Sequence, residues 1–180
     1  MRQKLSESLE ITPGISCELS NKQLKCKKDS AEVAISVDVP CMNVLLKENK
    51  VFFECEKGNK RDYKTIKSFI AHLKKTFIGL QNEYVYNLES CNVHFPMTLK
   101  VEGDKLIITN FLGEKTPRFA KILPGVKVDI KGQKITLTSH NKDAGGQTAA
   151  NFEKATKIRN RDRRIFQDGI FLVERPGGAK

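Results

Sequence analysis

The part of the sequence best suited to bind an anion is a run of positive charge near the C-terminus. Its eleven residues hold six cations and one anion, Asp162, for a net charge of +5. Four of the cations are arginines, whose planar guanidinium binds phosphate with two parallel hydrogen bonds and stacks on bases. A solvated helix end would need only lysine, since any cation is favoured at a helix C-terminus. The run therefore favours a phosphate-contacting segment, with candidates Lys154, Lys157, Arg159, Arg161, Arg163 and Arg164.

Charge elsewhere in the chain is less specific. The total of +11 favours a polyanionic partner, nucleic acid first, although an anionic membrane surface also attracts basic proteins. The excess is shared almost evenly, +5 in residues 1–80 and +6 in residues 81–180, so the local run matters more than the total. A second basic group is best interpreted as an ordinary exposed strand face; it comprises Lys22, Lys25, Lys27 and Lys28.

Residues that could carry catalysis do not form a recognisable set. The histidines are His72, His94 and His140, and no nucleophile elbow, phosphate loop or zinc-protease motif accompanies them. The five cysteines lack metal-ligand spacing and are expected to be free thiols in a reducing compartment. We expect no enzyme activity, cofactor, metal or membrane span. No secretory leader is expected, because residues 1–10 contain no apolar segment.

An internal similarity organises the chain into elements. Pro13–Leu19 recurs as Pro124–Ile130, an offset of 111 residues, and the similarity continues into a second alternating segment. Alternation bounded by turn residues predicts two antiparallel strands in each copy, with one face buried. In this register Cys17 and Cys26 occupy inward-facing positions and behave as small hydrophobic residues.

Each half also contains a helical pattern. The first is predicted from about Asn59 to Phe77, with Gly79 as the stop; the second starts near Asp143 as N-cap and carries Ile158 on its apolar face. The remaining strand candidates are residues 84–88, 97–102, 106–109 and 171–173, with a loop at 110–115. A sheet followed by a helix, given twice, predicts two tandem duplicated α+β domains, residues 1–81 and 82–180, each a small, mostly antiparallel sheet packed on one helix.

Several motifs of the second half resemble one known family. They are Asn110–Lys115, Leu123–Val126, His94-Phe95-Pro96 and Asn160–Phe171. The chain resembles, over essentially its whole length, the large-ribosomal-subunit protein numbered six in bacteria and nine in eukaryotes, with the eukaryotic form the closer match. The resemblance implies two duplicated α+β domains, in agreement with the pattern above.

The resemblance also implies a function. Members are structural components of the large subunit that bind its ribosomal RNA near the sarcin–ricin loop, beside the translation-factor site, mainly through the second domain. Implied partners are this RNA, neighbouring ribosomal proteins and translation GTPases, in a cytoplasmic, 60S-type ribosome whose assembly begins in the nucleolus. Positions matching the family motifs are Asn160, Arg161, Asp162 and Arg164, with a second candidate loop represented by Asn110, Phe111, Gly113 and Lys115.

The sequence departs from the family at one turn and leaves two alternatives open. The family's glycine-rich turn of the first domain here reads Lys28-Asp29-Ser30-Ala31-Glu32, without glycine. One alternative is an RNA-binding regulator outside the ribosome, which the same basic run would serve. The other is a thiol-dependent enzyme, against which the inward register of Cys17 and Cys26 argues.

Overall fold

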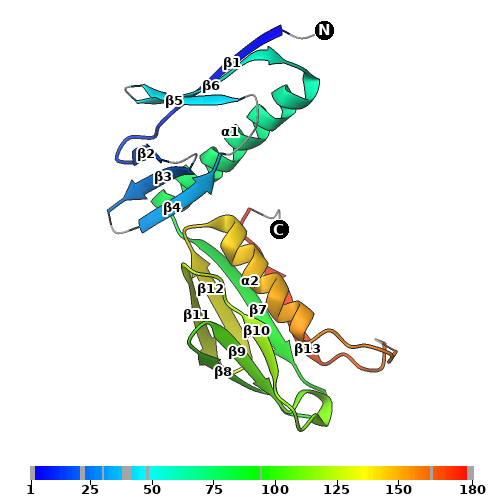
Figure 1. Ribbon diagram of the computed structural model, residues 1–180. Coiled ribbons are helices and arrows are strands. Elements are labelled where there is room, and N and C mark those ends of the chain that lie inside the picture. The colour runs from blue at the N-terminus through cyan, green and yellow to red at the C-terminus, as the bar shows by residue number, and fades with distance from the viewer. Residues whose placement is uncertain are drawn as a thin grey trace. The chain divides into compact units, whose positions relative to one another are not determined.

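A computed structural model describes residues 3–20, 23–29, 31–37, 42–47, 49–93, 95–162 and 164–177. The chain divides into two compact units, residues 1–82 and 83–180. Both are built from antiparallel sheets and one helix, which confirms the predicted fold class (Figure 1). Arg163, His94 and Cys41 lie outside the described residues. No helix among the described residues is long and apolar enough to cross a membrane.

The N-terminal unit holds two three-stranded sheets, ordered β1-β6-β5 and β2-β3-β4. Its apolar residues form one core between the sheets and the helix. The elements are β1 (Gln3–Glu10), β2 (Ser16–Ser20), β3 (Gln23–Lys28), β4 (Ala31–Ser36), β5 (Asn43–Lys47), β6 (Lys50–Gly58) and α1 (Lys60–Gln81).

The C-terminal unit holds a four-stranded sheet, β11-β12-β7-β13, and a three-stranded sheet, β10-β9-β8. Its helix lies along the strands and covers the core, as Figure 1 shows. The elements are β7 (Tyr84–Cys91), β8 (Thr98–Glu102), β9 (Lys105–Thr109), a 3₁₀ turn η1 (Phe111–Gly113), β10 (Arg118–Lys121), β11 (Val126–Lys131), β12 (Lys134–Ser139), α2 (Lys142–Ala155) and β13 (Gly169–Glu174).

The two units share a topology, but not in the register that the sequence suggested. Sheet β2-β3-β4 corresponds to β8-β9-β10, and β1-β6-β5 corresponds to β7-β12-β11. Cys17 pairs with Cys26 and Leu99 with Ile108, each position shifted by 82 residues (99 − 17 and 108 − 26). The helix N-caps, Asn59 and Asn141, are also 82 residues apart (141 − 59). The offset of 111 is therefore wrong.

The physical reason is that the 111-residue similarity joins two hairpins that are not equivalent. It relates β2-β3 to β11-β12, which occupy different sheets of the shared topology. A Pro-Gly turn followed by alternating residues describes any hairpin with one buried face, so it recurs without common position. The inward register itself is confirmed, because Cys26 is fully buried and Cys17 packs partly buried against the same core.

The helices end differently from the predictions because capping and packing outweigh single residues. Asn59 caps α1 in a capping box with Asp62, and the helix continues through Gly79, which is buried in its last turns. Helix α2 is capped by Asn141, whose side chain accepts from the backbone N–H groups of Asp143 and Ala144. It ends at Ala155, so the predicted helical position of Ile158 is wrong.

Gly145 lets α2 approach β7 closely. A Cβ at this position would lie 2.7 Å from Cε2 of Tyr86. That ring is buried and its hydroxyl donates a 2.7 Å hydrogen bond to the Lys142 carbonyl, so it cannot move aside. We expect Gly145→Ala to lower the free energy of unfolding by on the order of 1–2 kcal/mol, because overpacking outweighs the gain in helix propensity.

Urea unfolding of Gly145→Ala tests this expectation, with Gly146→Ala as the matched control. At Gly146 the closest atom to an added Cβ is the Tyr86 hydroxyl, at 3.3 Å. The control should therefore lose less stability. Equal stability of Gly145→Ala and the unmodified chain would contradict the close approach.

Candidate nucleic-acid interface

The basic segment begins where α2 ends, and Thr156 fixes that point. Its side-chain oxygen accepts a 2.9 Å hydrogen bond from the backbone N–H of Ile170, at the start of β13, and lies 3.3 Å from the carbonyl oxygen of Phe152 in the last turn of the helix. Thr156 is only 3% exposed. The segment between these two anchors, residues 157–168, is therefore held at both ends by the core.

We expect Thr156→Val to destabilise the chain, because it keeps the side-chain shape and removes the acceptor. The buried Ile170 N–H would be left without a partner, which costs about 1–3 kcal/mol. Thr156→Ser keeps the oxygen and is the control. Hydrogen exchange of the Ile170 amide and urea unfolding measure the effect; an unchanged exchange rate in Thr156→Val would contradict it.

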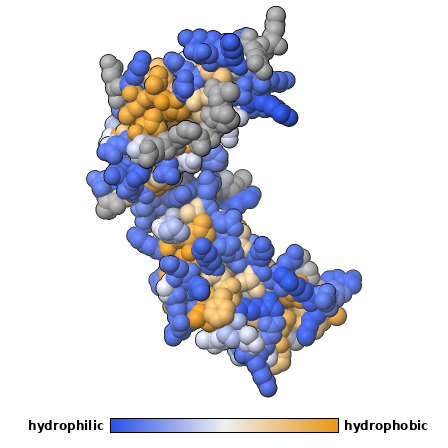
Figure 2. All heavy atoms as spheres, viewed as in Figure 1, coloured by the Kyte–Doolittle hydropathy of each residue, from blue (hydrophilic) through white to orange (hydrophobic). Residues whose placement is uncertain are grey.

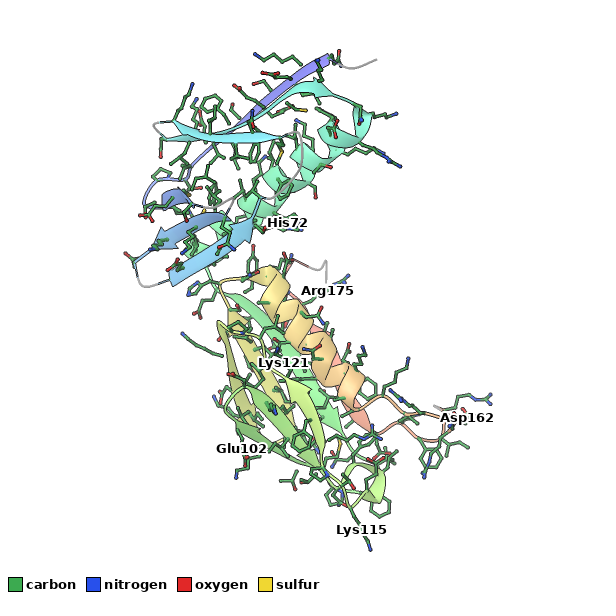
Figure 3. All side chains as sticks on the ribbon, in the orientation of Figure 1. His72, Glu102, Lys115, Lys121, Asp162 and Arg175 are labelled. Carbon is green, nitrogen blue, oxygen red and sulfur yellow. The ribbon has the colours of Figure 1, made fainter. Side chains whose placement is uncertain are left out.

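The cations of the segment are exposed and mostly unpaired. Lys154, Lys157, Arg159 and Arg161 are exposed, and none forms an ion pair in the described part of the chain. The Arg161 guanidinium lies 4.8 Å from the centroid of the Phe166 ring, which orients it. Figure 3 shows the loop that carries Asp162 projecting beyond the end of α2. These four side chains are therefore available to phosphate oxygens.

Arg164 differs from the other cations because it is already paired. Its guanidinium donates to Asp162 at 2.8 Å, and its backbone N–H donates to the same carboxylate at 2.9 Å. The Arg164 hydrogen bonds hold the pKa of Asp162 below its usual range. The Asp162 backbone carbonyl accepts from Ile165 and Phe166. Asp162 thus shapes the turn rather than contacting an anion; Asn160, exposed and at φ 56°, begins it.

The loop of residues 110–115 is tightly fixed. Asn110 is left-handed (φ 60°), and its side-chain amide donates to the Pro96 carbonyl at 3.0 Å. Phe111 is 1% exposed, so the prediction that it contacts RNA directly is corrected: its ring belongs to the core. Gly113 has φ 76°, and the ring of Phe95 lies against it. Gly113 and Lys115 remain exposed.

Arg118, which the sequence analysis missed, ties this loop to the end of α2. Its guanidinium donates to both carboxylate oxygens of Glu114, at 2.6 and 2.8 Å, and to the Ala155 carbonyl at 2.9 Å. It also lies 4.3 Å from the centroid of the Phe111 ring. The Arg118 hydrogen bonds, with a smaller contribution from the charge of Arg161, keep the pKa of Glu114 low.

The structure brings the two predicted regions together. A pocket of about 280 Å³ is lined by Leu112 and Glu114 from the loop, Arg118 from β10, and Ile158, Arg159 and Arg161 from the basic segment. Figure 3 places the loops carrying Lys115 and Asp162 at the same end of the C-terminal unit. In Figure 2 hydrophilic atoms and smaller hydrophobic patches alternate at this end.

A larger open groove of about 1070 Å³ adjoins the segment. Lys154, Lys157 and Arg159 contribute to its lining, together with the apolar side chains of Phe166 and Phe171. Cations beside apolar rings suit a nucleic acid, whose phosphates and bases need the two kinds of contact.

Asp168 is a second residue that the sequence analysis missed. It is 1% exposed, and it accepts a 2.7 Å hydrogen bond from the backbone N–H of Val93. The carboxylate thus fastens the end of the basic segment to the chain beyond β7. Its position before Gly169, whose φ is 155°, was the available signal.

The N-terminal unit offers no comparable surface in its described residues. Lys27 is paired with Glu32 at 3.7 Å, as expected for an ordinary exposed strand face. In the glycine-free turn, Asp29 adopts φ 50°, and Ser30 lies outside the described residues.

The fold and the surface together define a class of protein. Rigid antiparallel sheets present several unpaired cations at one end, and the described residues contain no group of three metal-ligating side chains. Such a protein supports a polyanion and does not transform a substrate.

Comparison with known proteins identifies the family. Residues 95–169 match the family described as Ribosomal protein L6. The chain is 37% identical over 171 residues to the large ribosomal subunit protein uL6 of Methanobrevibacter smithii, covering 95% of this chain and 96% of the relative. It is 38% identical over 175 residues to the protein of the same name from Methanosarcina mazei, covering 97% and 99%. The chain belongs to the uL6 family of large ribosomal subunit proteins. It is a structural protein and not an enzyme, as expected.

Proposed function

We propose that this chain is a structural constituent of the large ribosomal subunit and binds large-subunit ribosomal RNA through its C-terminal unit. The observation that carries the proposal is the set of exposed, unpaired cations at one end of that unit, Lys154, Lys157, Arg159 and Arg161. Membership of the uL6 family supports the ribosomal assignment.

The binding would divide between phosphates and bases. Lysines and arginines of the basic segment contact phosphate oxygens, which supplies affinity and position, and the shape of the folded RNA supplies specificity. Because Arg118 and Thr156 hold the loop and the segment on the core, these cations are presented in one arrangement. Little ordering is then required when RNA binds.

The finer assignment rests on the resemblance stated above. We propose that the RNA contacted lies near the sarcin–ricin loop, beside the translation-factor site, with neighbouring ribosomal proteins and translation GTPases as further partners. A cytoplasmic, 60S-type ribosome with nucleolar assembly belongs to the same proposal; the relatives described above are archaeal.

Sedimentation tests the proposed function. The tagged full-length chain, expressed in cells, should migrate with the large subunit through a sucrose gradient at high salt. Chemical footprinting of the purified subunit, with and without the chain, should show protection near the sarcin–ricin loop. A chain that remains at the top of the gradient would instead support the regulator outside the ribosome; association without that protection would contradict the finer assignment alone.

A further inference from the structure

Two cysteines of the N-terminal unit face each other across a strand pair. Cys17 on β2 and Cys26 on β3 are register partners, and their sulfur atoms lie 3.0 Å apart without a disulfide bond. Strand β2 is at the edge of its sheet, paired to β3 alone among the described strands. The close sulfur contact lies outside the surface proposed to bind RNA and has no part in that function.

The backbone at this pair already has the spacing of a disulfide. Opposed residues of an antiparallel pair have Cα atoms about 4.5–5.5 Å apart, which is within the roughly 4.4–6.8 Å that disulfides span. The sulfur atoms need to approach by about 1 Å, to a bond length near 2.05 Å. This approach requires side-chain rotation and no separation of the strands.

The two thiols are not equivalent. Cys26 is fully buried, whereas Cys17 is only partly buried and can meet a small solute. The hydrogen bond from Cys26 lowers the pKa of Cys17, while the same contact and burial raise the pKa of Cys26. Cys17 is therefore the thiol that ionises first, and the thiolate is the reactive form.

We propose that Cys17 and Cys26 are a peroxide-reactive thiol pair that closes into a cross-strand disulfide. The Cys17 thiolate attacks one oxygen of hydrogen peroxide, the O–O bond breaks, and a sulfenic acid and hydroxide form. The sulfur of Cys26 then attacks the Cys17 sulfur, the S–O bond breaks, and the departing hydroxyl leaves as water with the Cys26 proton. Two thiols lose two electrons, and peroxide becomes two waters.

The other described thiols lack these features. Cys55 is buried on β6, and Cys91 is partly exposed on β7; within the described residues, neither has a second sulfur in contact. Burial and the nearby charges of Glu89 and Asp168 raise the pKa of Cys91, so its thiolate is disfavoured. Cys91 is thus a matched comparison of similar exposure. The disulfide would fasten edge strand β2 to the sheet.

Mass spectrometry of the folded full-length chain tests the proposal. After a few equivalents of hydrogen peroxide, the intact mass should fall by about 2 Da, the loss of two hydrogens. Trypsin cleaves after Lys22 and Lys25, which lie between the two cysteines in the sequence. The peptides containing Cys17 and Cys26 should therefore stay joined until a reducing agent separates them. Cys91→Ser should behave in the same way.

Two variants make the assignment of roles falsifiable. In Cys26→Ser, Cys17 should accumulate as a sulfenic acid, a gain of about 16 Da that a cyclic diketone probe captures. In Cys17→Ser, which changes only the partly buried position, Cys26 should stay reduced. Oxidation of Cys91 before Cys17, a sulfinic acid at Cys17 of the unmodified chain without the disulfide, or oxidation of Cys26 in Cys17→Ser would each overturn the proposal.

Discussion

Replacing Lys154, Lys157, Arg159 and Arg161 together with glutamine should weaken RNA binding on the order of 10²–10³-fold at about 0.1 M salt. Each cation that neutralises a phosphate releases counterions and adds about 0.7–0.9 to the slope of log affinity against log salt. A basic segment that neutralises about five phosphates gives a slope on the order of −4, and the fourfold variant should reduce its magnitude by about 3. Filter-binding titrations across salt concentrations, with a large-subunit RNA fragment containing the sarcin–ricin loop, measure both quantities.

The control removes the same charge from elsewhere on the C-terminal unit. Lys100, Lys121, Lys127 and Lys131 are exposed, and three of them are paired: Lys100 with Glu102, Lys127 with Glu83 and Lys131 with Asp129. Their replacement with glutamine should leave the salt slope nearly unchanged. If both fourfold variants flatten the slope equally, only total charge matters and the basic segment is not the interface.

The second large effect is expected from Arg118→Lys, which keeps the charge and removes the planar fork. An ammonium cannot bond both Glu114 oxygens, reach the Ala155 carbonyl and stack on Phe111 at once. Since hydrogen bonds to charged groups contribute about 1.5–3 kcal/mol each and the replacement recovers part of them, we expect unfolding to become easier by about 2 kcal/mol. Amides of the 110–115 loop should exchange faster. Unchanged stability and exchange would show that Arg118 does not join the two regions.

Acid titration provides an independent check on the same contact. Because the Glu114 pKa is lowered in the folded chain, its contribution to stability is present above the pKa of the unfolded state. That contribution is lost as the pH falls through the lower pKa of the folded state. The difference in unfolding free energy between the unmodified chain and Glu114→Gln should therefore be largest near neutral pH and disappear in acid.

Local patterns predicted the elements because each depends on few neighbours. Alternation located the strands, helical spacing located both helices, and arginine density located the basic segment. Residues 171–173, a strand candidate, lie in β13 paired with β7. Errors arose where distant residues decide the outcome: Gly79 did not stop α1 because packing continued past it, and Phe111 is buried by a core that the loop sequence does not reveal.

Long-range contacts explain the residues that were missed. Arg118 is a single cation in a strand, and its importance comes from Glu114, Ala155 and Phe111, which the fold brings around it. Asp168 meets the Val93 N–H across 75 residues of sequence. No spacing rule encodes such contacts. The juxtaposition of the 110–115 loop with the basic segment is likewise a property of the fold and not of either motif.

Strand β13 has no counterpart among the described residues of the N-terminal unit, and this asymmetry has an entropic consequence. Because β13 pairs with β7, the basic segment is a closed loop with both ends attached, whereas a segment that left α2 freely would sample far more conformations. Much of the ordering required for binding is thus completed during folding. Deleting one strand that contacts no RNA would then weaken binding even if every cation remained.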